Sequence, residues 1–128
     1  MKPGATLVSI RPHRTWRPSI AIVTPSRRVL VAQLINSAFD TRLSAAEAAL
    51  IRVVQEGHFT LAGIHDHRYR ARLDNLSQLR TYLELIAPPR PRFPAGRRAR
   101  LVEIWKSRPR GAQIEIAESI VVTALQRC

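Results

Sequence analysis

The sequence predicts one α/β domain over 1–128, built from three main strands, an additional hairpin and about three helices. Two observations indicate this class. Apolar runs rich in Val and Ile alternate along the chain with segments in which apolar residues recur every three or four positions, an order typical of mixed folds. A hydrophobic fraction of 45% in 128 residues is sufficient for one packed core.

The opening stretch, 2–12, predicts a tight turn that leads into a short strand. Pro3 fixes φ and Gly4 accepts positive φ, so the pair favours a turn. Within 7–10 only Ser9 is polar, which is typical of a strand covered on both faces. We therefore expect this strand to be buried with neighbours on both sides, although the later segments offer candidates for one side only.

The next stretch predicts a hairpin between two loops. A proline-bracketed loop, 11–18, precedes a short strand, 19–23. The segment 24–27 has turn chemistry, and 29–35 is again of strand type, so the two strands are expected to pair. The segment 36–42 shows no clear period and is expected to be a loop.

The clearest predicted helix begins at Ser44. The Ser44 hydroxyl can cap the helix, and Glu47 stands three residues later as the partner of a capping box. Gly57 is expected to end the helix in a left-handed conformation. The following residues, 58–70, predict a long strand that is apolar in its first half and charged in its second.

Two shorter helices and a last strand complete the prediction. Asn75 is expected to cap a helix over 76–86, which ends before a Pro/Arg-rich internal linker, 88–94. A third helix is expected from Pro94 or Ala95 to about 107. The final apolar run, 113–126, reads as one long strand or as a hairpin bent near its middle, and the last two long strands are expected to pair antiparallel.

The chain is strongly basic, because 21 Lys and Arg oppose nine Asp and Glu and give a net charge of +12. This charge makes an anionic partner a candidate, although 19 of the 21 are Arg, an excess that a GC-rich coding sequence also produces. Since the arginines are spread along the chain, nucleic-acid binding is the alternative hypothesis and not the favoured one. The one cysteine, Cys128, excludes an internal disulfide.

No apolar run approaches the roughly 18 residues of a membrane span, and the N-terminus has no apolar signal core. The prediction is therefore a cytoplasmic protein without a membrane partner.

Candidate substrate-binding residues follow the carboxyl end of the opening strand. Ligands of open α/β sheets bind outside the carboxyl ends of strands, and guanidinium, imidazole and indole groups suit an anionic or aromatic ligand. The four candidates are Arg11, His13, Arg14 and Trp16. An equally weighted interpretation is that Trp16 covers the edge of the sheet while the arginines are solvated.

Two further clusters of side chains carry no assigned site. His65 and His67 share one face of a strand, but two ligands do not complete a metal site, so a solvated face is favoured. The basic segment 90–100 contains only Phe93 for stacking, so it is interpreted as a solvated linker and helix face. The sequence contains no motif for a serine or cysteine nucleophile and no glycine-rich phosphate loop, and no catalytic residue is assigned.

The opening stretch, Lys2-Pro3-Gly4-Ala5-Thr6-Leu7-Val8-Ser9-Ile10-Arg11-Pro12, resembles the "L-K-P-G-G-x-L-(apolar)" segment of class I S-adenosylmethionine-dependent methyltransferases. In that family this segment enters the fifth strand of the sheet. A sixth strand often follows a "G-(F)" step, here Gly57-His58-Phe59, and a seventh strand returns antiparallel, here 113–126. The helices between them would be an insertion of variable length.

The resemblance implies a partial Rossmann-like methyltransferase sheet and methyl transfer from S-adenosylmethionine to an unknown acceptor. The family's glycine-rich loop and its acidic cofactor-binding residues have no counterpart, so the chain is expected to be incomplete or inactive alone and to bind no S-adenosylmethionine by itself. A homo-oligomer, or an N-terminal partner chain that completes the sheet, is the expected partner. Two alternatives stay open: a small basic nucleic-acid-binding protein, and a partner subunit of a split enzyme.

Overall fold

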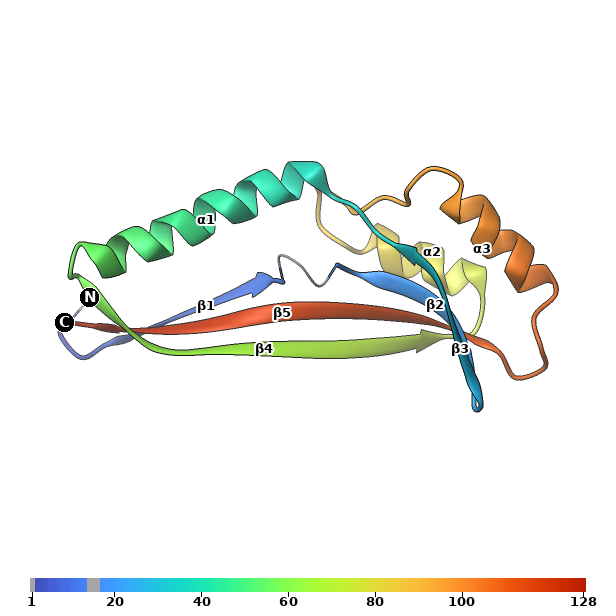
Figure 1. Ribbon diagram of the computed structural model, residues 1–128, viewed down its shortest axis with the longest axis horizontal. Helices are drawn as coiled ribbons and strands as arrows, with labels where there is room; N and C mark the ends of the chain where they lie inside the picture. The colour runs from blue at the N-terminus through green and yellow to red at the C-terminus, as the bar shows by residue number, and fades with distance from the viewer. Residues whose placement is uncertain (1, 14–16) are drawn as a thin grey trace.

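The computed structural model describes residues 2–13 and 17–128. In this part of the chain one antiparallel sheet of five strands has three helices on one side of it (Figure 1). In chain order the elements are β1 (Thr6–Pro12), β2 (Ser19–Thr24), β3 (Arg27–Gln33), α1 (Ser37–Gln55), β4 (Phe59–Leu73), α2 (Leu76–Glu84), α3 (Arg97–Lys106) and β5 (Gln113–Arg127).

Strand β5 is the centre of the sheet. Strand β4 pairs with nearly the whole of one edge of β5. Two strands divide the other edge of β5 between them: β1 pairs with 120–126 and β2 pairs with 113–117. Strand β3 pairs with the outer edge of β2. The antiparallel pairing expected for the last two long strands is therefore confirmed, and 113–127 is one continuous strand instead of a bent hairpin.

The predicted count of three main strands is too low. The hairpin expected from the turn at 24–27 is confirmed, and it belongs to the same sheet because β2 also pairs with β5. The mixed α/β class holds, with five strands and three helices in the described part of the chain. All neighbouring strands are antiparallel, whereas a Rossmann-like sheet is mostly parallel.

Helix α1 begins earlier than predicted. The side chain of Asn36 caps the helix by accepting a hydrogen bond from the Phe39 backbone N–H at 3.2 Å, so the segment expected as a loop is mostly helical. Ser44 lies inside the helix. The predicted end is confirmed, since Gly57 follows the last turn with φ of +78°.

Helices α2 and α3 flank the proline-rich linker. Asn75 caps α2 as predicted, by accepting a hydrogen bond from the Gln78 backbone N–H at 2.8 Å. Helix α3 begins at Arg97, slightly later than expected. Within the linker 88–94, Arg92 exchanges two backbone hydrogen bonds with Ile35, of 2.7 and 2.9 Å, which hold the linker beside the end of β3.

The main hydrophobic core lies between the sheet and helices α2 and α3. It buries side chains from five elements and from the end of the hairpin: Ile20, Ile22, Val31, Leu34, Leu79, Leu101, Trp105, Ile114 and Ile116. Helix α1 contributes much less, because Leu43 is its only buried residue. The core therefore fixes one end of the long β4–β5 ribbon, and α1 covers the other end more loosely.

Strand β5 packs against helices with one face at its beginning and with the opposite face at its end. Ile114 and Ile116 pack against α2 and α3, whereas Thr123 and Leu125 line a groove beneath α1. Pairing with β4 has no register shift from 114 to 124, so the alternation of side chains places these two pairs on opposite faces. Figure 1 shows all three helices on one side, and the twist of the long strands accounts for the change of face.

Strand β1 is not buried on both faces, contrary to the prediction. Val8 is 54% exposed and Ile10 is 66% exposed. The reason is that β1 has only β5 as a neighbour within the described residues, and α1 covers it on one side. The apolar pattern of 7–10 is therefore only partly satisfied by the rest of this chain.

Candidate functional site at the carboxyl end of β1

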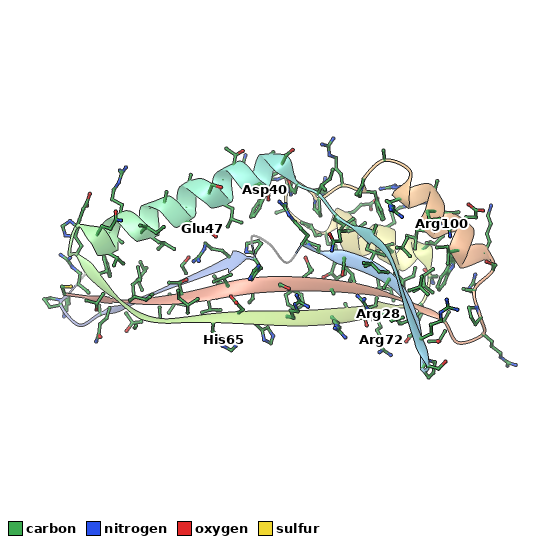
Figure 2. All side chains as sticks on the ribbon, viewed as in Figure 1. Arg28, Asp40, Glu47, His65, Arg72 and Arg100 are labelled. Atoms are coloured by element: carbon green, nitrogen blue, oxygen red, sulfur yellow. The ribbon has the colours of Figure 1, made fainter. Side chains whose placement is uncertain are left out.

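Arg11 lies near the end of β1 and is almost fully covered. Its guanidinium donates hydrogen bonds to Ser9 Oγ at 2.8 Å and to Thr123 Oγ1 at 3.0 Å. Its Nε is buried without a hydrogen-bond partner, 4.0 Å from the Oε1 atom of Glu47 on α1. Figure 2 shows Glu47 beneath α1, on the side of the helix that faces the sheet. The charge of Arg11 is thus held inside the space between α1 and the sheet.

His13 follows β1 directly and lies beside β4. Its Nε2 is 3.7 Å from Oδ1 of Asp66, and its side chain is 13% exposed. The backbone N–H of His13 donates to the Ser119 carbonyl at 2.8 Å, which continues the pairing of β1 with β5 by one residue. This arrangement places the imidazole that follows β1 beside a carboxylate of β4, across β5.

Arg17 and Asp40 form a two-contact ion pair close by. Arg17 Nη1 lies 2.7 Å from Oδ1 and 2.6 Å from Oδ2 of Asp40, in the first turn of α1. The pair joins the segment after β1 to the start of α1. Asp40 lies in the segment 36–42, which the sequence predicted as a loop, and so it is not among the predicted site residues.

Glu118 places a carboxylate in the middle of β5 near the same end of β1. Tyr82 of α2 donates a hydrogen bond to Glu118 Oε2. Burial, and then the hydrogen bond and negative charge of Glu118, raise the pKa of Tyr69 to about 12, and they raise the pKa of Tyr82 further above its usual range. Both hydroxyls therefore stay protonated at neutral pH.

A small cavity connects these groups. It has a volume of about 130 Å³ and is lined by residues that include His13, Arg17, Asp40 and Glu118. Its volume is below the roughly 300 Å³ at which small-molecule sites usually begin. A second, mostly apolar groove of about 330 Å³ lies beneath α1, with Arg11 and Glu47 among its lining residues.

Two of the four predicted substrate-binding residues can be placed. Arg11 and His13 lie at the carboxyl end of β1, as the order of the chain predicted, and each has an acidic neighbour. Arg14 and Trp16 lie outside the described residues. The acidic neighbours were not predicted, although Phe39, Leu43 and Leu50 do follow helical spacing and could have extended the predicted helix to include Asp40.

The groups at the carboxyl end of β1 do not fit S-adenosylmethionine. Acidic side chains near β1 could hold a ribose only if they were available, and Asp66 and Glu47 lie against His13 and Arg11 instead. The cavity at the carboxyl end of β1 is also too small for a nucleoside cofactor.

The two histidines of β4 share a face, as predicted. The rings of His65 and His67 are stacked with their centroids 6.4 Å apart, and Figure 2 shows His65 on the side of β4 away from α1. Asp66 points to the opposite face, toward His13. Among residues 2–13 and 17–128, no three His, Cys, Asp or Glu side chains are grouped closely enough to hold a metal ion.

Comparisons with family models, with curated proteins and with solved structures found no match to this chain. Within the described residues, none of the helices combines the length and the apolar character that crossing a membrane requires.

Proposed function

We propose that this chain is the C-terminal part of a methyltransferase-like fold, whose sheet is completed at the outer edge of β1 by a cofactor-binding half. The proposal rests on the resemblance of 2–12 to the methyltransferase segment and on one structural observation, the open, uncharged edge of β1. By that resemblance the parent reaction is methyl transfer from S-adenosylmethionine. The acceptor would bind at the carboxyl end of β1, next to Arg11 and His13.

The hydrogen-bond pattern supports an open edge at β1. The bonds from the His13 N–H to the Ser119 carbonyl and from the Arg127 N–H to the Ala5 carbonyl identify odd-numbered residues as the ones that bond to β5. In an antiparallel pair the intervening residues direct their N–H and C=O groups away from the partner. Thr6, Val8 and Ile10 therefore present backbone groups to the outer edge.

The three outer edges of the sheet differ in charge. Charged side chains protect a strand edge against further pairing. Strand β4 carries them only in its second half, from Asp66 to Arg72, and β3 begins with Arg27 and Arg28. Strand β1 has no charge from Thr6 to Ile10. The edges of β1 and of the first half of β4 are therefore the ones without this protection, and the resemblance of 2–12 selects β1 as the edge that the cofactor-binding half completes.

His13 and Arg11 would contact the acceptor. The imidazole of His13 lies beside the carboxylate of Asp66, and the guanidinium of Arg11 lies beside that of Glu47. In the proposed site these two side chains position the acceptor at the carboxyl end of β1.

A calorimetric titration tests whether the cofactor half is needed. We expect S-adenosylmethionine to give no saturable heat with this chain alone. Saturable binding in the micromolar range would show that these residues hold the cofactor, and the proposal of an incomplete fold would be wrong.

The coding sequence upstream provides a second, independent test. An open frame that encodes an acidic-x-G-x-G-x-G strand and turn supports a divided methyltransferase. A stop codon followed by a promoter, with no such segment encoded nearby, contradicts it.

A further inference from the structure

Three arginines surround one buried carboxylate on the face of the sheet opposite α2 and α3. Glu115 of β5 is 2% exposed. Arg28 of β3 donates a hydrogen bond from Nε to Glu115 Oε1 at 2.9 Å. The Nε atoms of Arg70 and Arg72, both on β4, lie 3.9 and 4.0 Å from the same carboxylate.

The alternation of the strands explains why these side chains meet. Ile114 and Ile116 face the core beneath α2 and α3, so Glu115 between them faces the other way. Arg72 is directly opposite Glu115 in the β4–β5 pairing, and Arg70 is two residues away on the same face. Figure 2 shows Arg28 and Arg72 on the side of the sheet away from α2 and α3.

The cluster carries more positive charge than its carboxylate requires. Arg28 already neutralises and hydrogen-bonds Glu115, while Arg70 and Arg72 lie beyond hydrogen-bond distance. Three guanidinium groups against one carboxylate leave a net charge of +2. The side chains of Arg70 and Arg72 are 57% and 60% exposed, so most of their N–H donors are open to another acceptor.

The row continues along β4. Arg68 alternates with Arg70 and Arg72 and so lies on the same face. Alternate residues of an antiparallel strand are roughly 6.8 Å apart, which gives a regular row of cations comparable in spacing with successive phosphates of a nucleic-acid strand. The only aromatic residue within 68–72 is Tyr69, which lies on the opposite face near Glu118.

We propose that this arginine face, Arg28, Arg68, Arg70 and Arg72, binds the phosphate backbone of duplex nucleic acid. Regularly spaced guanidinium groups suit phosphate oxygens, and the described residues place no stacking ring on this face, which argues against a single strand read through its bases. The inference is independent of the methyltransferase-like function. It assigns a location to the basic charge that the sequence alone left distributed over the whole chain.

Fluorescence anisotropy with a short labelled DNA duplex tests the proposal. The variant is Arg70→Gln/Arg72→Gln, which keeps the Arg28 partner of Glu115. The control is Arg97→Gln/Arg100→Gln, which removes the same number of positive charges from α3. Figure 2 shows Arg100 on this helix. We expect only the first variant to weaken binding and to lower the steepness of log K against log salt by about 2, since each lost phosphate contact contributes about 0.9.

Equal weakening by both variants would show that net charge alone drives binding, and the proposal would be wrong. It would also be wrong if the unchanged protein bound duplex without salt dependence, or bound a single strand or an anionic phosphatidylserine vesicle more tightly than the duplex at equal phosphate concentration. Thermal unfolding of each variant shows whether it remains folded.

Glu115→Gln gives a test in the opposite direction. The amide keeps an acceptor for Arg28 but removes the negative charge that competes with phosphate. Duplex affinity is expected to rise several-fold. An unchanged or lower affinity in a folded variant would mean that the arginines serve Glu115 only, and the face would not be a binding site.

Discussion

Tyr82 of α2 donates a hydrogen bond to the carboxylate of Glu118 in the middle of β5. Glu118 also acts on Tyr69 of the neighbouring strand β4. One carboxylate thus joins a helix and two strands where the coverage of the sheet changes from α1 to α2.

The two tyrosines predict a loss of stability at alkaline pH. Both have a pKa raised in the folded state, that of Tyr69 to about 12. The unfolded chain releases these protons near pH 10. The stabilisation of the folded state by the two protonated tyrosines is therefore complete below that pH and is lost as the pH rises toward 12. Urea unfolding at increasing pH should show this fall, and Tyr69→Phe should reduce its slope.

Glu118→Gln separates the two causes of the raised pKa values. The chain has only two tyrosines, so phenolate absorption reports them alone. Since burial is the first cause and Glu118 the second, the variant should ionise at lower pH than the unchanged protein but still above the usual value. An unaltered titration curve would show that Glu118 does not contact the tyrosines in solution.

Gly57 is expected to be intolerant of a side chain for conformational reasons alone. Its φ is +78°, and no heavy atom lies within 4 Å of an added Cβ. Gly57→Ala should therefore destabilise the protein by about 1 to 2 kcal/mol through backbone strain. Gly63→Ala is the matched control, because Gly63 has the same open surroundings without positive φ. Equal effects in urea unfolding would contradict the left-handed end of α1.

The stability that α3 adds to the fold should depend on Leu101 much more than on the adjacent Val102. Leu101 is 2% exposed and belongs to the core, whereas Val102 is 36% exposed. Leu101→Ala is expected to cost about 2 to 5 kcal/mol of unfolding free energy, and Val102→Ala about 0.5 kcal/mol. Chemical denaturation compares them. A larger effect at Val102 would mean that α3 packs through a different face.

Features fixed by neighbours in sequence could be predicted well. The Asn75 cap, the turn at 24–27 and Gly57 each depend on residues within one turn or hairpin, and all three are confirmed. The predicted start of α1 is wrong because Ser44 and Glu47 match a capping box in sequence although Ser44 lies inside the helix. Asn36 caps instead, and Arg17, distant in the chain, binds Asp40 in the first turn.

Only the position of the site in the fold could be predicted from the sequence. The carboxyl end of an apolar strand indicated where Arg11 and His13 lie. Their acidic neighbours, Glu47 and Asp66, come from α1 and β4, and no local pattern reports which residues a sheet places opposite one another. The arginine face was missed for the same reason, because it depends on the register between β4 and β5.

The exposed edge of β1 predicts self-association. Ile10 is 66% exposed beside backbone groups that have no partner strand among the described residues, and such edges favour pairing with another chain. Ile10→Lys should shift the protein toward monomer in sedimentation experiments. Ile64→Lys, at a residue that is 62% exposed on β4, is the control. Equal shifts would show that the edge of β1 is not the specific surface of association.

Amide hydrogen exchange along β1 tests the open edge most directly. In the monomeric chain the amides of Leu7, Ser9 and Arg11, which bond to β5, should exchange slowly, while those of Val8 and Ile10 should exchange rapidly. Slow exchange at Val8 and Ile10 in a confirmed monomer would show that this edge is already covered. A sheet completed at β1 by a separate cofactor-binding half would then be excluded.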